Sequence, residues 1–522
     1  MLLDRFLHDA AQRHPDKEAL ICGEQRTTYG RLESQANALA HAMRALGLRR
    51  QQRVAIYLEN STEAVQGIFA TLKASGVFVV VNPQVKADKL AFILDDCEVA
   101  ILLTSRRQLT GIASQLAGCA ALRHLVVADW EDSSEGPAGA AELLAAGKGI
   151  HPLTTLLASQ PDTLPDNRNV SIDLSSLIYT SGSTGVPKGV MLSHANMLAA
   201  SWSITTYLRN QPDDIILSPL PLAFDYGLYQ VLMAIRFGGT VVLEKSFTYP
   251  YRYIELIAKE RVTGLPIVST MSAILLNLED LGQHDFSSVR YLTNTAQALP
   301  ERHIRRLRQV MPQARIYSMY GLTECKRVAY LPPELIDTKP TSVGIAMPDT
   351  EVWIENETGQ VITTPGERGE LVVRGAHVML GYWNRPEETA RALRPGRYPY
   401  ERELRTGDLF TQDADGHLYF VSRKDDLIKT AGERVGPREV ENVLYELDAV
   451  KEAAVIGVPD DTLGSAVKAV LALRDGMQLD EAAVIKHCQR RLERFMVPKH
   501  VAFVAELPKT STGKINKRAL AG

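Results

Sequence analysis

The sequence predicts an α/β fold with three parts: a large N-terminal domain of helix-covered β-sheets, a β-rich subdomain, and a small α+β C-terminal domain. Short apolar runs alternate with helix-like periods over residues 1–150 and again over residues 173–324, a pattern typical of parallel sheets covered by helices. Residues 340–421 are rich in strand-forming and turn-forming residues. A chain of 522 residues is also too long for one compact core.

The first region begins the alternation clearly. RVAIYL (53–58) predicts a buried strand, STEAVQGIFATLKASG (61–76) a helix, and VFVVVNP (77–83) a second strand. Residues 131–170 are polar and contain Gly and Pro, so we expect an exposed connection or insertion there.

The later regions follow the same logic. The α/β alternation resumes in LSSLIYT (174–180), DDIILSPLP (213–221), GLYQVLMAIRFGG (227–239), TVVLEK (240–245), YRYIELIAKERV (251–262) and TGLPIVS (263–269). The β-rich part contains EVWIENETGQVI (351–362), GELVVRG (369–375) and GHLYFVSR (416–423). A small unit follows with REVENVLYEL (438–447), VKEAAVIGVPD (450–460), KAVLALR (468–474) and EAAVIKHCQRRLE (481–493). We therefore predict domains at 1–421 and 427–522, joined by a hinge at 422–426.

The bulk composition excludes several classes of protein. A net charge of −3 with 23% charged residues shows no nucleic-acid footprint. The five cysteines are scattered without a CxxC pair, which disfavours a zinc or disulfide framework and fits a reducing, cytoplasmic compartment. No long apolar run predicts membrane insertion, and the N-terminus lacks the pattern of a signal peptide.

The stretch YTSGSTGVPKG (179–189) has the composition of a phosphate-binding loop. A Walker loop would continue into a helix at its lysine, whereas here Pro187 precedes Lys188 and the apolar VMLS (190–193) follows. We therefore predict a loop between two strands, whose amides and hydroxyls can still bind phosphate. The alternative, a plain Gly/Ser surface loop, is disfavoured by the length of the pattern. The candidate phosphate-binding residues are Thr180, Ser181, Gly182, Ser183, Thr184, Gly185 and Lys188.

This loop resembles the signature of the adenylate-forming superfamily, which contains acyl-CoA synthetases, stand-alone peptide-synthetase adenylation enzymes and luciferases. Further motifs resemble that family in the same order: YGLTE (320–324), GELVVRG (369–375), GYWNRPEET (381–389), RTGDL (405–409), SRKDDLIKTAGERVGPREVE (422–441) and LPKTSTGKINKRAL (507–520). The resemblance implies that a carboxylate and ATP form an acyl-adenylate and pyrophosphate, and that a thiol then captures the acyl group. It implies ATP, Mg²⁺ and either coenzyme A or carrier-bound phosphopantetheine.

The same resemblance implies roles for single residues. Glu324 corresponds to the Mg²⁺-associated glutamate, Thr323 to a contact of the α-phosphate, and Tyr320 to the residue that stacks on adenine. Asp408 would accept hydrogen bonds from the ribose hydroxyls, and Arg423 would assist at the ribose or the phosphates. The remaining implied ATP contacts are Asn294, Thr295, Gly321 and Phe420.

The C-terminal domain is expected to be mobile by the same resemblance. Lys514 corresponds to the adenylation lysine, which bridges the carboxylate and the α-phosphate, although a lysine so near the end of a chain is usually solvated. Asp425 corresponds to the hinge residue, and Gly432 would line the thiol tunnel after rotation of the domain.

The acid-binding pocket leaves alternatives open. Phe224–Asp225 stands where many acyl-CoA synthetases have Phe-His, and it resembles the Phe-Asp of amino-acid-activating domains, in which the aspartate pairs with the substrate ammonium. The alternative is a helix N-cap before the following apolar run. Lys326 and Arg327 face either a polar substrate or solvent. The other pocket candidates are Tyr226, Tyr229, Leu292, Met319 and Val328.

Together these features predict an AMP-forming acid–thiol ligase. We expect it to activate a small amino or polar acid and to transfer it to the phosphopantetheine of a separate carrier protein. The alternative is an acyl-CoA synthetase that joins a short- or medium-chain carboxylic acid to coenzyme A. A non-catalytic scaffold is disfavoured because Glu324, Asp408 and Lys514 are all present.

Overall fold

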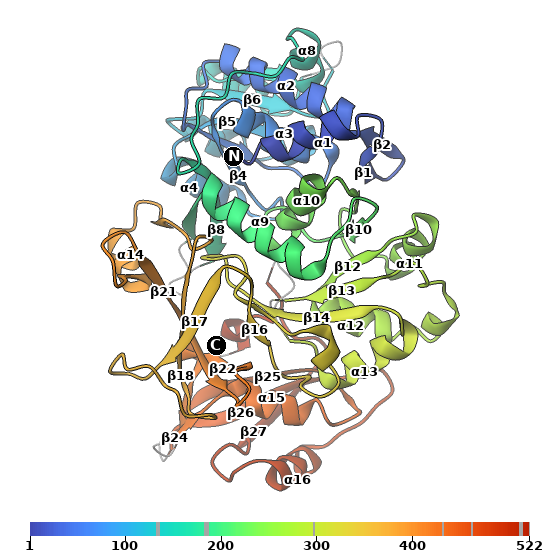
Figure 1. The fold of residues 1–522 in the computed structure, drawn as a ribbon, viewed down its shortest axis with the longest axis vertical. Helices are drawn as coiled ribbons and strands as arrows, with labels where there is room; N and C mark the ends of the chain where they lie inside the picture. Colours follow the sequence, from blue (N-terminus) through green and yellow to red (C-terminus); the bar gives the residue numbers. More distant parts are fainter. Residues whose placement is uncertain are drawn as a thin grey trace.

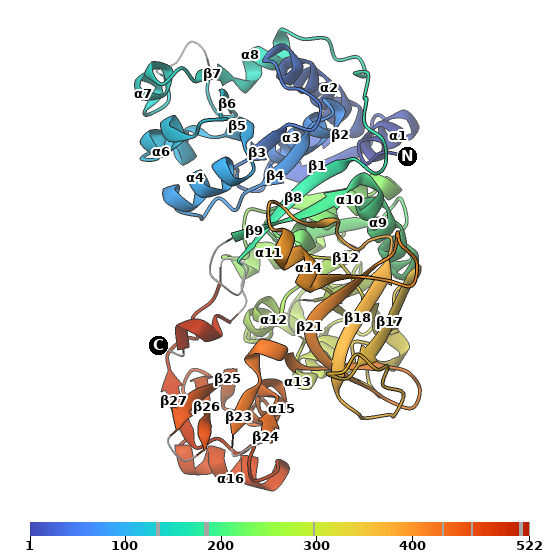
Figure 2. The same cartoon turned by 90° about the vertical axis from the view of Figure 1, so that its left-hand side faces the viewer.

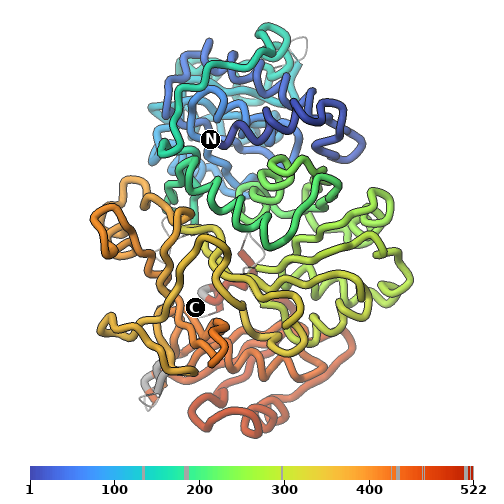
Figure 3. Tube along the Cα trace, viewed as in Figure 1, coloured from blue at the N-terminus to red at the C-terminus, as the bar shows by residue number. Residues whose placement is uncertain are grey.

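The computed structural model describes residues 1–131, 136–181, 187–295, 298–430, 433–460, 463–510 and 515–520. For Ser181, Asp425, Lys429, Glu433, Arg434 and Arg518 it describes the backbone alone. The described chain forms an α/β protein with a large N-terminal domain and a small C-terminal domain, as predicted (Figures 1 and 3).

The first sheet lies in the N-terminal part of the chain, with strand order β7-β6-β5-β3-β4-β8-β9-β19. Its neighbours are parallel from β7 to β8, and β9 and β19 are added antiparallel. The strands are β3 (Arg53–Ile56), β4 (Val77–Val80), β5 (Val99–Thr104), β6 (His124–Val127), β7 (Gly149–Pro152), β8 (Leu174–Ser181), β9 (Pro187–Ser193) and β19 (Gly381–Tyr382). The helices of this region are α1 (Arg5–Arg13), α2 (Tyr29–Ala45), α3 (Thr62–Lys73), α4 (Ala87–Asp96), α5 (Arg106–Leu109), α6 (Ala113–Gly118), α7 (Ala140–Ala145) and α8 (Leu153–Ala158).

The second sheet has the order β16-β15-β14-β13-β12-β10-β11-β1-β2 and is parallel from β14 to β1. Its strands are β1 (Glu18–Cys22), β2 (Gln25–Thr28), β10 (Ile215–Ser218), β11 (Thr240–Leu243), β12 (Gly264–Ile267), β13 (Tyr291–Asn294), β14 (Arg315–Tyr320), β15 (Ala329–Tyr330) and β16 (Ile345–Ala346). The helical segments beside it are α9 (His194–Leu208), α10 (Asp225–Phe237), α11 (Pro250–Lys259), α12 (Ser269–Leu276), η1 (Leu281–Gln283), α13 (Glu301–Val310) and η2 (Pro333–Leu335).

A third, antiparallel sheet forms the predicted β-rich subdomain, and the small domain has a sheet of its own. The third sheet contains β17 (Thr350–Glu355), β18 (Gly369–Gly375), β20 (Leu393–Pro395), β21 (Arg402–Gln412) and β22 (Leu418–Arg423), with α14 (Pro386–Ala392) nearby. The small domain contains β23 (Ile428–Thr430), β24 (Glu433–Val435), β25 (Val450–Asp460), β26 (Gly464–Leu473), β27 (His500–Val504), α15 (Pro437–Leu444) and α16 (Glu481–Arg491). The 3₁₀ turn η3 (Lys424–Asp426) precedes the small domain, and η4 (Lys517–Leu520) is its last helical segment. Figure 2 shows the small domain beside α13 and the third sheet.

The strands of the first sheet are buried on both faces. Val54 and Ile56 pack into the larger core, which contains apolar residues from α2, α3, α9 and α10, whereas Ala55 and Tyr57 pack on the opposite side under α4 and α6. Continuous apolar runs such as VAILLT (99–104) are what a parallel sheet covered on both faces requires. None of the described helices combines the length and apolar character needed to span a bilayer.

The expectation of an exposed connection over residues 131–170 was wrong for residues 140–158. Helix α7, strand β7 and helix α8 lie there, and β7 extends the first sheet parallel to β6. These elements are only four to six residues long, so their periodicity is too short to stand out in a polar, Gly-rich sequence.

Candidate active site

The candidate site residues gather where the parallel strands β12, β13 and β14 end and where α10 begins. In open α/β sheets, ligands bind outside the carboxyl ends of the strands. Gly227 in the first turn of α10 lets this helix pack closely on the loop that follows β10, because a Cβ there would lie 2.4 Å from the carbonyl oxygen of Pro221. The fold thus brings segments that are far apart in sequence to one edge.

The phosphate-loop candidate joins two strands, as predicted. Strand β8 pairs antiparallel with β9, with Thr180 opposite Lys188 and Ser181 opposite Pro187. Helix α9 begins only after β9, where Ser193 and Asn196 form a capping box. Gly182, Ser183, Thr184 and Gly185 lie outside the described residues.

Lys188 and Glu324 are linked through Tyr382. The Lys188 ammonium lies 5.5 Å from the centre of the Tyr382 ring and 3.9 Å from Oε1 of Glu388. The Tyr382 hydroxyl donates a hydrogen bond of 2.7 Å to Oε1 of Glu324. Tyr382 was not among the predicted site residues, although GYWNRPEET contains it; the position of a tyrosine in an ordered motif was the available signal.

A second group forms around Asp408, which is buried. Its Oδ2 accepts a 2.6 Å hydrogen bond from the Tyr320 hydroxyl, and its Oδ1 lies 3.2 Å from Nε of Arg423. Burial raises the pKa of the Asp408 carboxyl, against the opposing effect of the Arg423 charge. The Tyr320 ring lies 4.8 Å from Phe410 and 6.3 Å from Phe420. Phe410 was also missed, because it follows the RTGDL motif.

The loop 321–328 connects β14 to β15 and carries the central residues of the site. The amide of Val328 donates to the carbonyl of Tyr320 and closes the loop. Gly321 is required by packing, since a Cβ there would lie 2.3 Å from the carbonyl oxygen of Lys326. Thr323 and Glu324 in this loop are partly exposed, so they remain open to a ligand.

Asp225 already has a cationic partner within the protein. The Lys326 ammonium donates to the backbone oxygen of Asp225 at 2.8 Å and lies 3.6 Å from its Oδ2. It also lies 4.5 Å from the centre of the Tyr229 ring. Burial lowers the pKa of Lys326 to about 7, and its backbone adopts φ 62°, a conformation that costs a non-glycine residue about 1 kcal/mol or more.

The N-cap alternative for Asp225 is therefore corrected. The N-cap of α10 is Phe224, and Asp225 is the first helical residue. The Asp225 carboxylate has a protein ammonium beside it, so its buried charge is compensated within the protein. The solvent-facing alternative for Lys326 and Arg327 is wrong as well, since the two residues are 3% and 2% exposed.

The other pocket candidates lie together in the interior. Tyr226 donates from its hydroxyl to the backbone oxygen of Thr293, and Tyr207 donates to the sulfur of Met319. The Arg327 guanidinium lies 5.5 Å from the centre of the Tyr226 ring. The remaining candidates Tyr229, Leu292, Asn294, Thr295 and Val328 are also buried.

The C-terminal residues of the prediction are only partly described. Lys514 and Gly432 lie outside the described residues, and of Asp425 the structure describes the backbone within η3. The small domain contacts the large one through an ion pair of 3.0 Å between Arg368 and Glu439 and through Arg302, which donates to the backbone oxygen of Val450.

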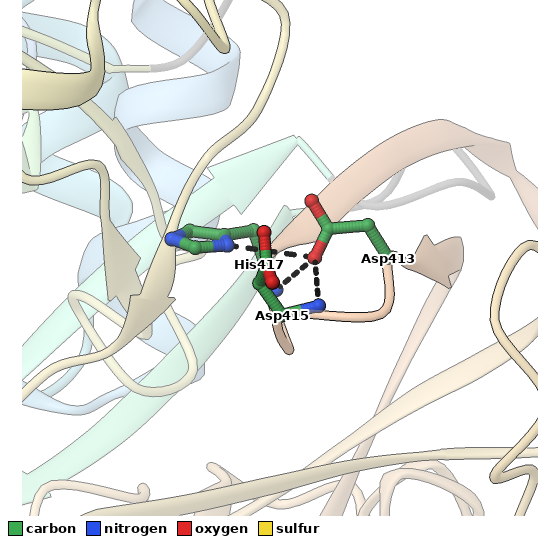
Figure 4. Close-up of side chains that lie close together, drawn as sticks. All are labelled: Asp413, Asp415 and His417. Carbon is green, nitrogen blue, oxygen red and sulfur yellow. Dashed lines mark hydrogen bonds and ion pairs between the residues drawn. The ribbon is translucent and has the colours of Figure 1, made fainter.

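Two places in the described chain present possible metal ligands. Glu324 offers carboxylate oxygens, which suit Mg²⁺, and it forms no ion pair with a described basic residue. Asp413, Asp415 and His417 also lie close together (Figure 4). Here Lys339 already supplies the cation, with its Nζ 2.6 Å from Asp413 and 2.8 Å from Asp415. The donor set at Glu324 therefore fits a magnesium ion, whereas the Asp413 cluster is a structural ion-pair network.

Comparison with known proteins defines the class. Residues 7–383 match the family of AMP-binding enzymes, and residues 439–514 match the AMP-binding enzyme C-terminal domain. The chain belongs to this family, which confirms the resemblance to adenylate-forming enzymes. It is an ATP-dependent, AMP-forming ligase.

Individual relatives are similar over nearly their whole length. A long-chain-fatty-acid–CoA ligase of Bacillus subtilis (strain 168) is 31% identical, over 99% of this chain and 94% of the relative. An indoleacetate–CoA ligase of Aromatoleum aromaticum (strain DSM 19018 / LMG 30748 / EbN1) is 32% identical, over 99% and 97%. The crystal structure of an anthranilate CoA ligase in complex with anthranoyl-AMP has a TM-score of 0.88 and 26% identity, covering 100% of this chain and 96% of that one.

Proposed function

We propose that this ligase activates a carboxylic acid with ATP and transfers the acyl group to coenzyme A. The observation that carries the proposal is the buried Asp225–Lys326 pair, which removes the reason to expect an amino-acid substrate. The similarity to CoA ligases supports coenzyme A as the acceptor. The packed, aromatic surroundings of Tyr226 and Tyr229 favour a compact acid over a long alkyl chain.

In the adenylation step, a carboxylate oxygen attacks the α-phosphorus of ATP and pyrophosphate leaves. The carboxylate is already a nucleophile, so the protein supplies charge stabilisation and orientation. We assign these tasks to Thr323 at the α-phosphate and to Lys514 between the carboxylate and the phosphate. Glu324 would hold Mg²⁺, which neutralises phosphate charge when bound.

The nucleotide would lie between the phosphate loop and the Asp408 group. Tyr320 would stack on adenine beside Phe420. Asp408 and Arg423 would bind the ribose, and Asp408 already accepts hydrogen bonds from both Tyr320 and Arg423. Gly321, Asn294 and Thr295 would line the adenine side. The phosphate contacts proposed are Thr180, Ser181, Gly182, Ser183, Thr184, Gly185 and Lys188.

We place the hinge at residues 422–426, with Asp425 as the pivot. Strand β22 of the large domain ends at Arg423, and β23 of the small domain begins at Ile428. Rotation there would withdraw Lys514 and bring Gly432 to the thiol path, as hinge-driven enzymes do.

ATP–pyrophosphate exchange with a panel of carboxylic and amino acids tests the proposal. We expect plain carboxylic acids to stimulate exchange, and the product to form a thioester with coenzyme A more rapidly than with a pantetheinylated carrier protein. Exchange with amino acids alone, or acyl transfer to the carrier alone, would contradict it. The reaction with the carrier protein is the comparison for the reaction with coenzyme A in this experiment.

A further inference from the structure

Arg327 is a buried cation without an anionic partner in the described part of the chain. Its Nε and Nη1 have no hydrogen-bond partner there, and the neighbouring carboxylate of Asp225 pairs with Lys326 instead. A guanidinium buried without a counter-charge is strongly unfavourable, and the Tyr226 ring face offsets only a small part of that cost. The N–H groups of these two nitrogens are therefore available to bind an anion.

The position of Arg327 relates it to the acid-binding region. It belongs to the loop 321–328 that also carries Glu324, and its Cα would lie only 2.9 Å from a Cβ at Gly321. Its guanidinium lies against Tyr226 in the first turn of α10, and it also forms a hydrogen bond with the buried hydroxyl of Tyr207. Arg327 thus belongs to the loop that carries Glu324, and its guanidinium lies against an aromatic residue of the pocket.

We infer that Arg327 selects a carboxylic acid that carries a second carboxylate. One carboxylate reacts with ATP, and the other accepts hydrogen bonds from the free N–H groups of Arg327, a pairing in which arginine and carboxylate geometries match. Lys326 does not compete for this carboxylate, because its ammonium is held by Asp225. This inference rests on the proposed acid-activating function and narrows its substrate class to dicarboxylic acids.

The test compares acids that differ only in their second charge. ATP–pyrophosphate exchange is measured with straight-chain dicarboxylates of increasing length, with their monomethyl esters and with monocarboxylates of equal length. We expect the best dicarboxylate to exceed its monomethyl ester by about tenfold or more in kcat/KM, as loss of a charged hydrogen bond predicts. Arg327→Met should abolish this preference by raising the KM for the dicarboxylate. Arg306→Met, at an exposed arginine, should leave the preference unchanged.

A binding measurement separates specificity from folding. Without ligand, Arg327→Met should melt at the parental temperature or above, since replacement of an unpaired buried charge by an apolar side chain is often neutral or stabilising. The best dicarboxylate should raise the melting temperature of the parent and not that of Arg327→Met. Equal use of the monomethyl ester by the parent, or a preference retained by Arg327→Met, would overturn the inference and leave the acid ligase intact. If no acid stimulates exchange, the proposed function fails, and the inference falls with it.

Discussion

The hydroxyl of Tyr382 lies 2.7 Å from Oε1 of Glu324, across 58 residues of sequence. Two backbone contacts hold the pair in place: Tyr382 in β19 pairs with Val190 of β9, and the amide of Met379 donates to the backbone oxygen of Glu324. The orientation of the Glu324 carboxylate therefore depends on the strand that follows the phosphate loop.

Substitution of Tyr382 by Phe should impair the use of Mg²⁺. Loss of the donor leaves the Glu324 carboxylate less well oriented, and loss of such supporting hydrogen bonds at metal sites costs about tenfold or more in affinity or activity. We expect the Mg²⁺ concentration for half-maximal ATP–pyrophosphate exchange to rise, with the KM for the acid unchanged. Tyr400→Phe, on an exposed residue, is the matched control. An unaltered Mg²⁺ titration would remove the positioning role of Tyr382.

Substitution of Asp408 by Asn should weaken ATP binding specifically. The amide keeps the shape of the carboxylate but loses the charge that Arg423 faces and the capacity to accept from two ribose hydroxyls. We expect the KM for ATP to rise about tenfold, and the penalty for 3′-deoxy-ATP to shrink relative to the parent. Asp415→Asn, at an exposed carboxylate, controls for loss of charge. If Asp408→Asn penalises ATP and 3′-deoxy-ATP equally, Asp408 does not contact the ribose.

Substitution of Asp225 by Ala should destabilise the protein, because it leaves the Lys326 ammonium buried and unpaired. Removal of one member of a buried ion pair costs about 3 kcal/mol in the free energy of unfolding. Asp225→Ala combined with Lys326→Met should recover most of this loss, which urea denaturation of the two single variants and the double variant measures. A stable Asp225→Ala enzyme that loses exchange only with amino acids would restore the amino-group interpretation.

Substitution of Lys514 by Ala should block adenylation and spare the second half-reaction. One cation aimed at developing negative charge contributes about a hundredfold or more to the rate. We expect ATP–pyrophosphate exchange to fall by that factor, while preformed acyl-adenylate is still converted to thioester. Lys517→Ala is the control, since Lys517 forms an ion pair of 2.6 Å with Glu441. Equal loss of both half-reactions would contradict a role confined to adenylation.

His194 should make the fold sensitive to acid. It is buried, its Nδ1 accepts a hydrogen bond from the amide of Leu3, and burial lowers its pKa from 6.5 to about 4. Between these pH values the unfolded chain binds more protons, so the free energy of unfolding decreases as the pH falls through this window. His194→Gln should reduce that decrease by about 3 kcal/mol, measured by urea denaturation at pH 7 and pH 4. His500→Gln, at an exposed histidine, should leave this decrease unchanged. An equal decrease in the free energy of unfolding in the parent and in His194→Gln would refute the role of His194.

Local sequence patterns were sufficient to predict the structure of segments that is determined by residues adjacent in the chain. The run RVAIYL predicted a buried strand, and β3 confirms it. The proline before Lys188 and the apolar residues after it predicted a loop between two strands, and the β8–β9 pairing confirms that. The motif residues Tyr320 and Asp408 came from ordered resemblance, and the structure brings them into contact.

Other features could not be predicted because they depend on distant partners. The cation that compensates Asp225 is Lys326, 101 residues away, and no local pattern indicates which of two adjacent basic residues will be paired. Tyr382 reaches Glu324 only because β19 pairs with β9. The short elements α7, β7 and α8 gained stability from tertiary contacts that their own periodicity does not reveal.

By itself, the sequence determined the α/β class, the strand-flanked glycine loop and the adenylate-forming family, because periodicity, turn residues and ordered motifs are local properties of the chain. Only the tertiary structure decided which charges meet: it paired Asp225 with Lys326 and left Arg327 buried without an acidic partner among the described residues. The reason is physical, since the energy of a charge depends on its burial and on the groups around it, and both are set by contacts between segments far apart in the chain.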